Sequence, residues 1–252
     1  MTAPLISGTK WLGSPMRQDQ GLTRLFCFPF AGGGPSAFRS WLPYLENEVE
    51  LLPVHLPGRE RRRQEAPIVD ADALATAAAE AIAPWVRSPY AMYGHSMGAL
   101  LAHRVVRNLL ADGHPAPERV FVAARRAPHL PPDSPLVHEL PRKQLVERLR
   151  DMGGTPSELL DDDHFLDTVE PLIRADFRVS ELARLMPADD PLPVSVVALG
   201  GLSDAHVSRA SLREWHRHTS GTFTLHTVTG GHFFHTENAH AVTRLVVREL
   251  YG

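Results

Sequence analysis

Gly94-His95-Ser96-Met97-Gly98 separates a short apolar run, residues 90–93, from a longer segment, residues 99–110, that is apolar at helical spacing. A Gly-x-Ser-x-Gly pattern between a strand and a helix is typical of a nucleophile elbow, which exposes a serine hydroxyl at a strand end. Glycine has no Cβ and therefore permits the sharp turn. The pattern predicts that Ser96 is a nucleophile at a helix N-terminus, where the helix dipole favours developing negative charge. Standing alone, it is equally compatible with an ordinary Gly/Ser turn.

The composition is that of a globular protein with a large core. The chain has 252 residues, 43% of them hydrophobic, and a net charge of −3, too small to indicate binding to nucleic acid or to a membrane surface. The single cysteine, Cys27, lies in an apolar run, which suits packing in a reducing compartment. Residues 1–15 lack the pattern of a signal peptide, and no stretch reaches the 18 apolar residues of a membrane span. We expect a cytoplasmic protein.

Short apolar runs alternate with helical segments along the chain. The predicted strands are residues 25–28, 51–55, 90–93, 120–124, 194–199 and 223–228. Helices are predicted over about residues 70–86, after Ser96, and over about residues 238–251. Strands without polar alternation that alternate with helices predict an α/β fold, with a mostly parallel sheet covered on both faces. We expect residues 1–252 to form one domain.

One region interrupts the alternation of strands and helices. Residues 129–190 show helical patterns without a convincing strand, begin with the proline-rich 129–132 and contain the acidic turn Asp161–Asp163. Helices inserted between two strands near the nucleophile predict a lid over the site. The alternative is that they complete the outer layer of the fold.

A serine nucleophile needs a base to accept its proton and a carboxylate to orient that base. Among the 14 histidines, His232 has the best context, because it follows the last predicted strand in Gly230-Gly231-His232-Phe233-Phe234. The two glycines let this loop fold back toward the edge of the sheet, and the phenylalanines are suited to anchor it. His95, adjacent to the serine on a sharp turn, is expected to pack or to form a hydrogen bond locally.

Asp204 is the favoured acid because it directly follows the predicted strand 194–199, one strand before the histidine loop. This placement matches the chain order Ser, Asp or Glu, then His of Gly-x-Ser-x-Gly hydrolases. Asp133 is the alternative, but it lies nine positions after the end of the preceding strand, beyond three prolines. Asp189 and Asp190 precede a strand and are expected at the opposite edge.

A tetrahedral intermediate needs two preorganised N–H donors, which together form an oxyanion hole. We expect one from the backbone of Met97 and the other from Ala31, in the glycine-rich loop that follows the first strand. Phe30 is the neighbouring candidate. This loop is not a nucleotide cradle, because it lacks Gly-Lys-Ser/Thr and position 37 breaks Gly-x-Gly-x-x-Gly.

We expect neither a metal nor a cofactor. His232, His235 and His240 lie close together in the sequence, but no cysteine pair and no His-Glu-x-x-His accompanies them.

Five segments together resemble the type II thioesterases, the stand-alone editing enzymes of polyketide and nonribosomal peptide synthetases. The segments are Phe28-Pro29-Phe30-Ala31-Gly32-Gly33, Leu56-Pro57-Gly58-Arg59-Glu60-Arg61-Arg62, Gly94–Gly98, Arg125-Arg126-Ala127-Pro128 and Gly230–Phe234. They occur in one order over nearly the whole chain, which makes the resemblance far more specific than the elbow alone.

The resemblance implies an α/β-hydrolase fold with a helical lid, and Ser96, Asp204 and His232 as the catalytic triad. It also implies hydrolysis of acyl groups held as thioesters on the 4′-phosphopantetheine arm of a carrier-protein partner. Members of the family often have an acidic pair near the catalytic acid, whereas Leu202-Ser203-Asp204-Ala205 offers one carboxylate. How Asp204 is supported is therefore an open question.

The arginine-rich loop, residues 59–63, has two interpretations. Acidic carrier proteins and the phosphate of their arm are suitable partners for this loop or for Arg125 and Arg126. The alternative, which we favour for any single arginine, is a solvated loop with one arginine buried in a structural ion pair.

Two other functions fit the same residues: a carboxylesterase or lipase acting on free oxygen esters, and a non-catalytic binding protein that retains the fold. We expect a monomer. The sequence does not indicate the synthetase served or the preferred acyl length.

Overall fold

The computed structural model describes residues 10–12, 21–45, 47–86, 89–132 and 135–252. Six strands form one sheet in the order β2-β1-β3-β4-β5-β6, and every neighbouring pair is parallel. The strands are β1 (Thr23–Phe28), β2 (Val49–Pro53), β3 (Tyr90–His95), β4 (Arg119–Ala123), β5 (Val196–Gly201) and β6 (Phe223–Val228). The sequence placed all six within about two residues of these bounds, and the predicted α/β fold is confirmed.

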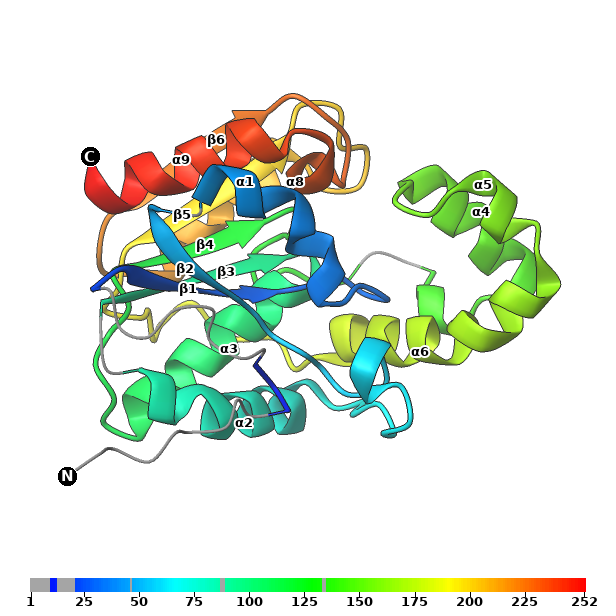
Figure 1. Ribbon diagram of the computed structural model, residues 1–252, viewed down its shortest axis with the longest axis horizontal. Helices are drawn as coiled ribbons and strands as arrows, with labels where there is room; N and C mark the ends of the chain where they lie inside the picture. The colour runs from blue at the N-terminus through cyan, green and yellow to red at the C-terminus, as the bar shows by residue number, and fades with distance from the viewer. Residues whose placement is uncertain (1–9, 13–20, 46, 87–88, 133–134) are drawn as a thin grey trace.

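Helices cover both faces of the sheet (Figure 1). The short α1 (Leu42–Leu45) and the C-terminal α9 (Ala239–Tyr251) lie on one face, and α2 (Ala71–Ile82) and α3 (Met97–Ala111) lie on the other. Asp70 caps α2 by accepting the N–H of Ala73 at 2.8 Å, as the acidic start of that segment suggests. The short α7 (Arg209–Arg213) and α8 (Phe234–Glu237) follow β5 and β6. The 3₁₀ turns are η1 (Pro35–Trp41), η2 (Glu60–Arg62), η3 (Ala83–Trp85), η4 (Val137–Glu139) and η5 (Glu214–His218).

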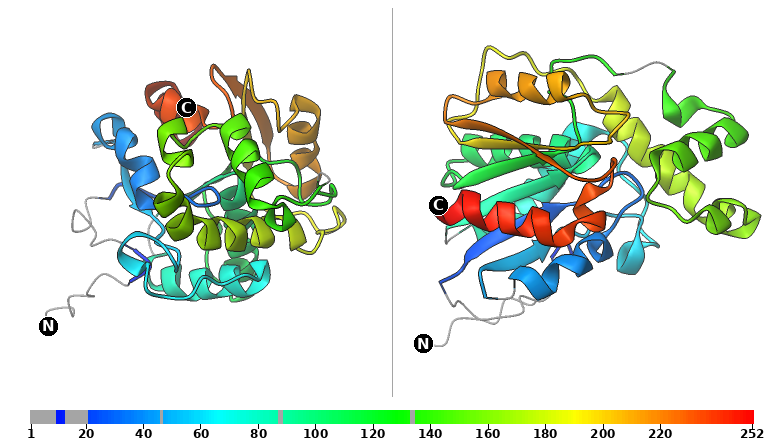
Figure 2. Two further views of the ribbon diagram at one scale, coloured as in Figure 1. Left: turned by 90° about the vertical axis from the view of Figure 1, so that its right-hand side faces the viewer. Right: turned by 90° about the horizontal axis from the view of Figure 1, so that it is seen from above.

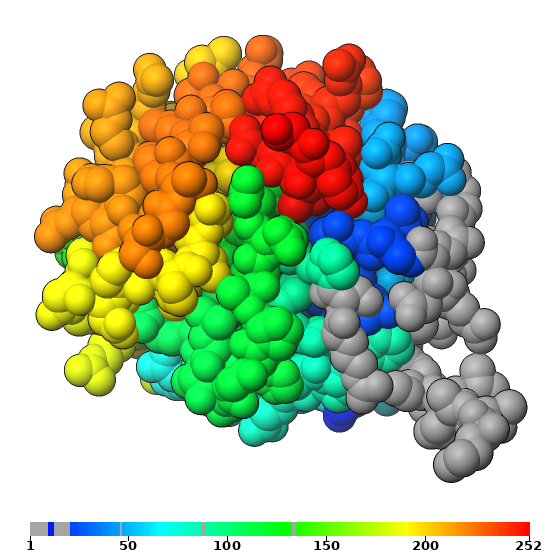
Figure 3. All heavy atoms as spheres, turned by 90° about the vertical axis from the view of Figure 1, so that its left-hand side faces the viewer, coloured from blue at the N-terminus to red at the C-terminus, as the bar shows by residue number. Residues whose placement is uncertain are grey.

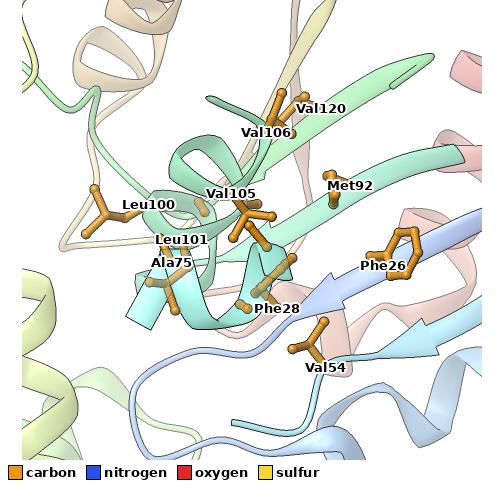
Figure 4. Close-up of a cluster of buried hydrophobic side chains, with 14 of the residues drawn as sticks. Phe26, Phe28, Val54, Ala75, Met92, Leu100, Leu101, Val105, Val106 and Val120 are labelled. Carbon is orange, nitrogen blue, oxygen red and sulfur yellow. The ribbon is translucent and has the colours of Figure 1, made fainter. Parts of the chain in front are cut away.

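The larger core cluster fills the space between the sheet and the α2–α3 face. Phe26, Phe28 and Met92 of the sheet pack beside Leu101 and Val105 of α3, and all five are fully buried (Figure 4). Every residue of β3 is buried, because helices cover the sheet on both sides. The absence of polar alternation in this strand is the sequence signature of that environment.

The insertion between β4 and β5 holds the helices α4 (Arg142–Met152), α5 (Ser157–Leu160) and α6 (Asp163–Leu182). They project beyond the carboxyl ends of the strands, as Figures 1 and 2 show. Val137, Leu145 and Phe177 form a small core cluster of their own under these helices. The inserted helices therefore lie at the carboxyl edge of the sheet, the place in which the sequence predicts a lid.

The side of the molecule opposite the inserted helices is formed by other parts of the chain. Figure 3 shows this side, with the C-terminal helix α9 in red beside the green segment that follows α3. Among the described residues, no helix is both long enough and apolar enough to cross a membrane.

Candidate active site

In the sheet, β1 has β2 on one side and β3 on the other. The chain therefore changes direction across the sheet after β2, and β1 and β3 are neighbours at this switch point. In open α/β sheets, ligands bind outside the carboxyl ends of the strands at such a switch point. Phe28 at the end of β1 is paired with Gly94 of β3, so the glycine-rich loop and the elbow leave the sheet side by side. The topology therefore brings the two segments of the predicted oxyanion hole to the same crevice.

Ser96 occupies the turn between β3 and α3 in a backbone conformation that residues other than glycine rarely adopt. Its φ is 53° and its ψ is −114°. Its N–H donates to the carbonyl of Ala123 at 2.8 Å, which ties the elbow to the end of β4. Backbone strain of this kind costs on the order of 1–3 kcal/mol and persists only where the surroundings fix it, commonly at functional sites.

The two glycines of the elbow are required because the backbone approaches other backbone closely. A Cβ on Gly98 would lie 2.1 Å from the carbonyl oxygen of Phe28, and one on Gly94 would lie 2.1 Å from the carbonyl oxygen of Gly98. Neither neighbour is a side chain that can rotate away. The Gly-x-Ser-x-Gly spacing thus reflects the contact between the start of α3 and the ends of β1 and β3.

Gly98→Ala is expected to destabilise the protein by about 1–3 kcal/mol or more, because the added methyl group forces apart α3 and the loop after β1. Urea denaturation measures the loss. Gly231→Ala is the matched control, since a Cβ there meets only one atom, at 3.9 Å. Equal stability of the Gly98→Ala and Gly231→Ala variants would contradict the close contact.

The structure brings together the three side chains predicted from chain order. Nε2 of His232 lies 3.2 Å from Oγ of Ser96, and Nδ1 of His232 lies 2.9 Å from Oδ2 of Asp204. The side chains of His232 and Asp204 are 4% and 0% exposed, so solvent hardly competes for these hydrogen bonds. A carboxylate on Nδ1 keeps the proton there and leaves Nε2 free to accept a proton from the serine hydroxyl.

Asp204 is supported by backbone rather than by a second carboxylate. Its Oδ1 accepts the N–H groups of His206 at 2.8 Å and Val207 at 3.2 Å. Burial acts to raise the pKa of Asp204, but the bond and attraction from His232 and the two amides outweigh it and lower the pKa below its usual value. The carboxyl group is therefore ionised at neutral pH, and these amides answer the question of support that the sequence left open.

The loops that carry the acid and the base are bonded to each other. The N–H of Leu202 donates to the carbonyl of Val228 at 2.8 Å, and that of Ser203 donates to the carbonyl of Gly230 at 2.9 Å. A Cβ on Gly201 would lie 2.2 Å from the carbonyl oxygen of Gly231, so the two strand ends are in direct contact. The pairing of β5 with β6 thus continues into both loops and fixes Asp204 beside His232.

His95 forms hydrogen bonds, as predicted, but one of its partners is distant in sequence. Its Nε2 donates to the carbonyl of His232 at 2.7 Å, and its Nδ1 accepts from the Tyr93 hydroxyl at 3.2 Å. Burial, followed by the proximity of His235 and His232, lowers the pKa of His95 well below its usual value. A neutral His95 therefore holds the backbone of the histidine loop in place.

The two predicted oxyanion donors lie where strand ends meet helix and loop. Met97 is the first residue of α3, where backbone N–H groups have no partner within the helix. Ala31 lies in a turn closed by the hydrogen bond from the Gly33 N–H to the Phe30 carbonyl, at 2.9 Å. Among the described residues, no acceptor is recorded for the N–H of Ala31.

Two cavities meet at Ser96 and His232. The larger has a volume of about 970 Å³ and lies between the loop after β1 and the inserted helices, with Phe165, Leu172 and Ile173 among its apolar lining residues. The smaller has a volume of about 80 Å³ and is lined by cationic side chains, including Arg126 and Arg148. An apolar cavity with a few convergent polar groups is the usual form of a small-molecule site, and the larger volume lies within the usual range.

The arginine-rich loop contains the structural ion pair that the sequence left as an alternative. The guanidinium of Arg59 is buried and forms two hydrogen bonds with the carboxylate of Asp176, at 2.7 and 2.8 Å. Arg62 pairs with Glu65 at 2.7 Å and stacks on Trp11, with its Cζ 4.3 Å from the ring centroid. These two arginines stabilise the loop itself.

Sequence reasoning missed Asp176, which also contacts the glycine-rich loop. The available signal is its position on α6, three residues after Ile173 and one before Phe177, on the helix face that packs inward. A carboxylate on an apolar helix face needs a partner.

Two further predictions concern acidic residues and metals. Asp190 pairs with Arg107 near the C-terminal end of α3, away from the site as predicted, while Asp133 lies outside the described residues. No cluster of three or more His, Cys, Asp or Glu side chains suitable for a metal ion occurs in the part of the chain that the structure describes.

Comparison with known proteins identifies the family. Residues 23–250 match the model of the thioesterase domain. The chain is 34% identical over 241 residues to the gramicidin S biosynthesis protein GrsT of Aneurinibacillus migulanus, covering 96% of this chain and 94% of the relative. It is 35% identical over 236 residues to a protein named linear gramicidin dehydrogenase LgrE, of Brevibacillus parabrevis, covering 92% and 89%.

A solved structure agrees with this match. The type II thioesterase BorB from the borrelidin biosynthetic cluster superposes with a TM-score of 0.87 at 33% identity, covering 96% of this chain and 98% of that one. The chain therefore belongs to the thioesterase family and is a type II thioesterase, a hydrolase of thioesters.

Proposed function

We propose that Ser96, His232 and Asp204 form the catalytic triad and that they hydrolyse acyl groups carried as thioesters on the phosphopantetheine arm of acyl or peptidyl carrier proteins. The enzyme would remove aberrant or stalled acyl units in polyketide or nonribosomal peptide synthesis. The observation that carries the proposal is the hydrogen-bonded Ser96–His232–Asp204 array at the base of an apolar cavity of about 970 Å³. Family membership makes carrier-bound acyl chains the appropriate substrate class.

The geometry supports a reaction in two halves. Ser96 Oγ attacks the thioester carbonyl carbon while Nε2 of His232 takes the hydroxyl proton, and the N–H groups of Met97 and Ala31 stabilise the oxyanion. The C–S bond then breaks, and His232 gives its proton to the departing thiolate. In the second half, His232 deprotonates a water molecule that attacks the acyl-serine, and the carboxylic acid leaves as the proton returns to Ser96.

We propose that α4, α5 and α6 act as the lid of this site, within a single domain. Leu149 of α4, together with Phe165 and Ile173 of α6, lines the larger cavity on the side away from the sheet. These side chains provide apolar surface for an acyl chain and restrict water near the acyl-serine. Water remains necessary for the second half, so the lid must admit single molecules.

The name of the LgrE relative suggests a dehydrogenase, but the site gives no support for dinucleotide binding. The glycines at 32–34 lead into the 3₁₀ turn η1 rather than into an α-helix whose N-terminus could hold a pyrophosphate. Gly32 donates its N–H to Asp176 at 2.7 Å, so this amide is not available to bind a phosphate oxygen. The N-terminus of α3, the other candidate for holding phosphate, follows directly from Ser96 in the triad.

The same triad can hydrolyse thioesters and oxygen esters. A comparison of the two substrate classes therefore separates the proposal from a carboxylesterase or lipase. We expect kcat/KM for acyl groups on a phosphopantetheinylated carrier protein to exceed that for the matching p-nitrophenyl esters by at least about tenfold. The acyl chains are the same in the two series, so the substrates differ only in the leaving group. A higher kcat/KM on the free oxygen esters at every chain length would contradict the proposal.

A non-catalytic binding protein is distinguished by active-site labelling. A fluorophosphonate probe should modify Ser96 and no other serine, since Nε2 of His232 lies 3.2 Å from that hydroxyl and can activate it. Failure to label a folded sample would favour the binding protein.

A further inference from the structure

Asp176 joins the inserted helices to the glycine-rich loop. It lies on α6, and its side chain is 1% exposed. Its Oδ2 accepts the N–H of Gly32 at 2.7 Å, while both of its oxygens bond to Arg59. Arg59 in turn donates to the carbonyl of Gly33 at 3.0 Å. One buried ion pair thus holds two peptide groups of the loop, Ala31–Gly32 and Gly33–Gly34.

The loop that is held in this way is a β-turn formed by residues 30–33. The Gly33 N–H bonds to the Phe30 carbonyl, and Gly32, the third residue of the turn, has a φ of +79°, as in a type II turn. The related type I turn differs mainly by a flip of the peptide between residues two and three. Asp176 accepts the N–H of that peptide, so its carboxylate favours the type II arrangement.

Ala31 is the second residue of the turn, and its N–H is the proposed oxyanion donor. A flip of the Ala31–Gly32 peptide would swing the Ala31 carbonyl, an acceptor, to a new position and alter the dihedral angles on both sides of it. Oxyanion stabilisation depends on donors that are oriented before the reaction. Holding the turn in one arrangement is therefore a catalytic requirement as well as a structural one.

Arg59 neutralises the negative charge that Asp176 places beside the glycine-rich loop. A bare carboxylate bonded to Gly32 would repel the negative charge that develops beside Ala31 during acyl transfer. The bidentate contact with Arg59 neutralises this charge where solvent is excluded, since the Arg59 side chain is 4% exposed. The pair can thus orient the turn without opposing the oxyanion.

We propose that Asp176 and Arg59 are positioning residues for the oxyanion hole, so that α6 of the inserted helices holds in one arrangement the turn that carries the Ala31 N–H. This inference rests on the proposed oxyanion role of Ala31. It assigns Arg59 of the Leu56–Arg62 motif to positioning of the turn rather than to carrier binding.

The test is the double variant Arg59→Met/Asp176→Leu, because replacing a buried ion pair by apolar side chains of similar size commonly preserves the fold. We expect kcat to fall on the order of 10²-fold, the effect of losing one oxyanion donor. KM should change by less than about threefold. Asp176→Asn keeps one acceptor oxygen, and we expect an intermediate loss of about tenfold.

A transition-state analogue distinguishes positioning from a merely structural role. An alkyl boronic acid forms a tetrahedral adduct on a nucleophilic serine, and its affinity should fall in parallel with kcat. The affinity for a non-hydrolysable acyl thioether, which has no oxyanion, should stay within about threefold of wild type.

The matched control is Arg24→Met/Glu50→Leu. This part-buried ion pair joins β1 to β2, with 2.9 Å between its nearest atoms, near the amino ends of the strands. It should lower the melting temperature without changing kcat or boronate affinity.

A folded Arg59→Met/Asp176→Leu enzyme with wild-type kcat, or with unchanged boronate affinity, would overturn the inference. Should the double variant fail to fold, the same criteria apply to Asp176→Asn. Failure of the triad assignment is a separate result, because Ser96→Ala would then retain activity.

Discussion

Ser96→Ala is expected to lower turnover of acyl-carrier thioester by about 10⁶-fold, the scale seen when the nucleophile of a triad is removed. The Ser96 hydroxyl lies 3.2 Å from Nε2 of His232, the base that would take its proton. Stopped assays of free acid released from an acyl-carrier protein measure the loss. The fold should be retained, since alanine removes only the hydroxyl oxygen.

The control for this prediction is Ser203→Ala, an exposed serine in the same loop as Asp204. It tests whether loss of any hydroxyl near the triad has the same effect, and it should leave turnover within about twofold, as expected of a surface change. Retention of more than about a tenth of wild-type turnover in Ser96→Ala would show that another group is the nucleophile.

Asp204→Asn is expected to lower kcat by about 10⁴-fold through the wrong histidine tautomer. The amides of His206 and Val207 both donate to Oδ1, so the carbonyl oxygen of an asparagine would take that position. Its NH₂ group would then face Nδ1 of His232, where Oδ2 of Asp204 now accepts a proton 2.9 Å away. The imidazole would place its proton on Nε2, directed at Ser96, and would lose its capacity as a base.

Nitrogen-15 NMR of the histidine ring measures the tautomer directly, alongside kcat. We expect the Nδ1–H form in the wild type and the Nε2–H form in the Asp204→Asn variant. An Nδ1–H tautomer in the variant, or a loss of kcat below about tenfold, would mean that another acid orients His232. Asp133, the acid that the sequence left open, would then be the first candidate.

The residues that sequence reasoning found are those for which position along the chain determines position in space. In a parallel sheet all carboxyl ends lie at one edge, so a serine after β3, an acid after β5 and a histidine after β6 must converge. The sequence also predicted the sharp turn of the elbow, because Gly94 and Gly98 stand where backbone contacts leave no room for a Cβ. Local rules and topology therefore sufficed for the candidate triad.

The residues that it missed act through contacts that no local pattern encodes. Asp176 meets Arg59 across 117 residues, and the geometry of that meeting depends on how α6 packs over the loop after β1. His95 reaches the carbonyl of His232 across 137 residues in the same way. The bounds of the inserted helices were also coarse: residues 129–190 were predicted, and α4 to α6 occupy Arg142–Leu182. Contacts such as those of Asp176 with Arg59 and of His95 with His232 depend on side-chain positions in the folded protein.

The most direct measurement is rapid-quench mass spectrometry of the enzyme during hydrolysis of an acyl-carrier thioester. If Ser96 attacks the thioester, peptides containing Ser96 should carry the mass of the acyl group, and the acylated fraction should rise before free acid reaches its steady rate. Steady release of acid from the carrier with no acyl group on Ser96 at any time would contradict the account.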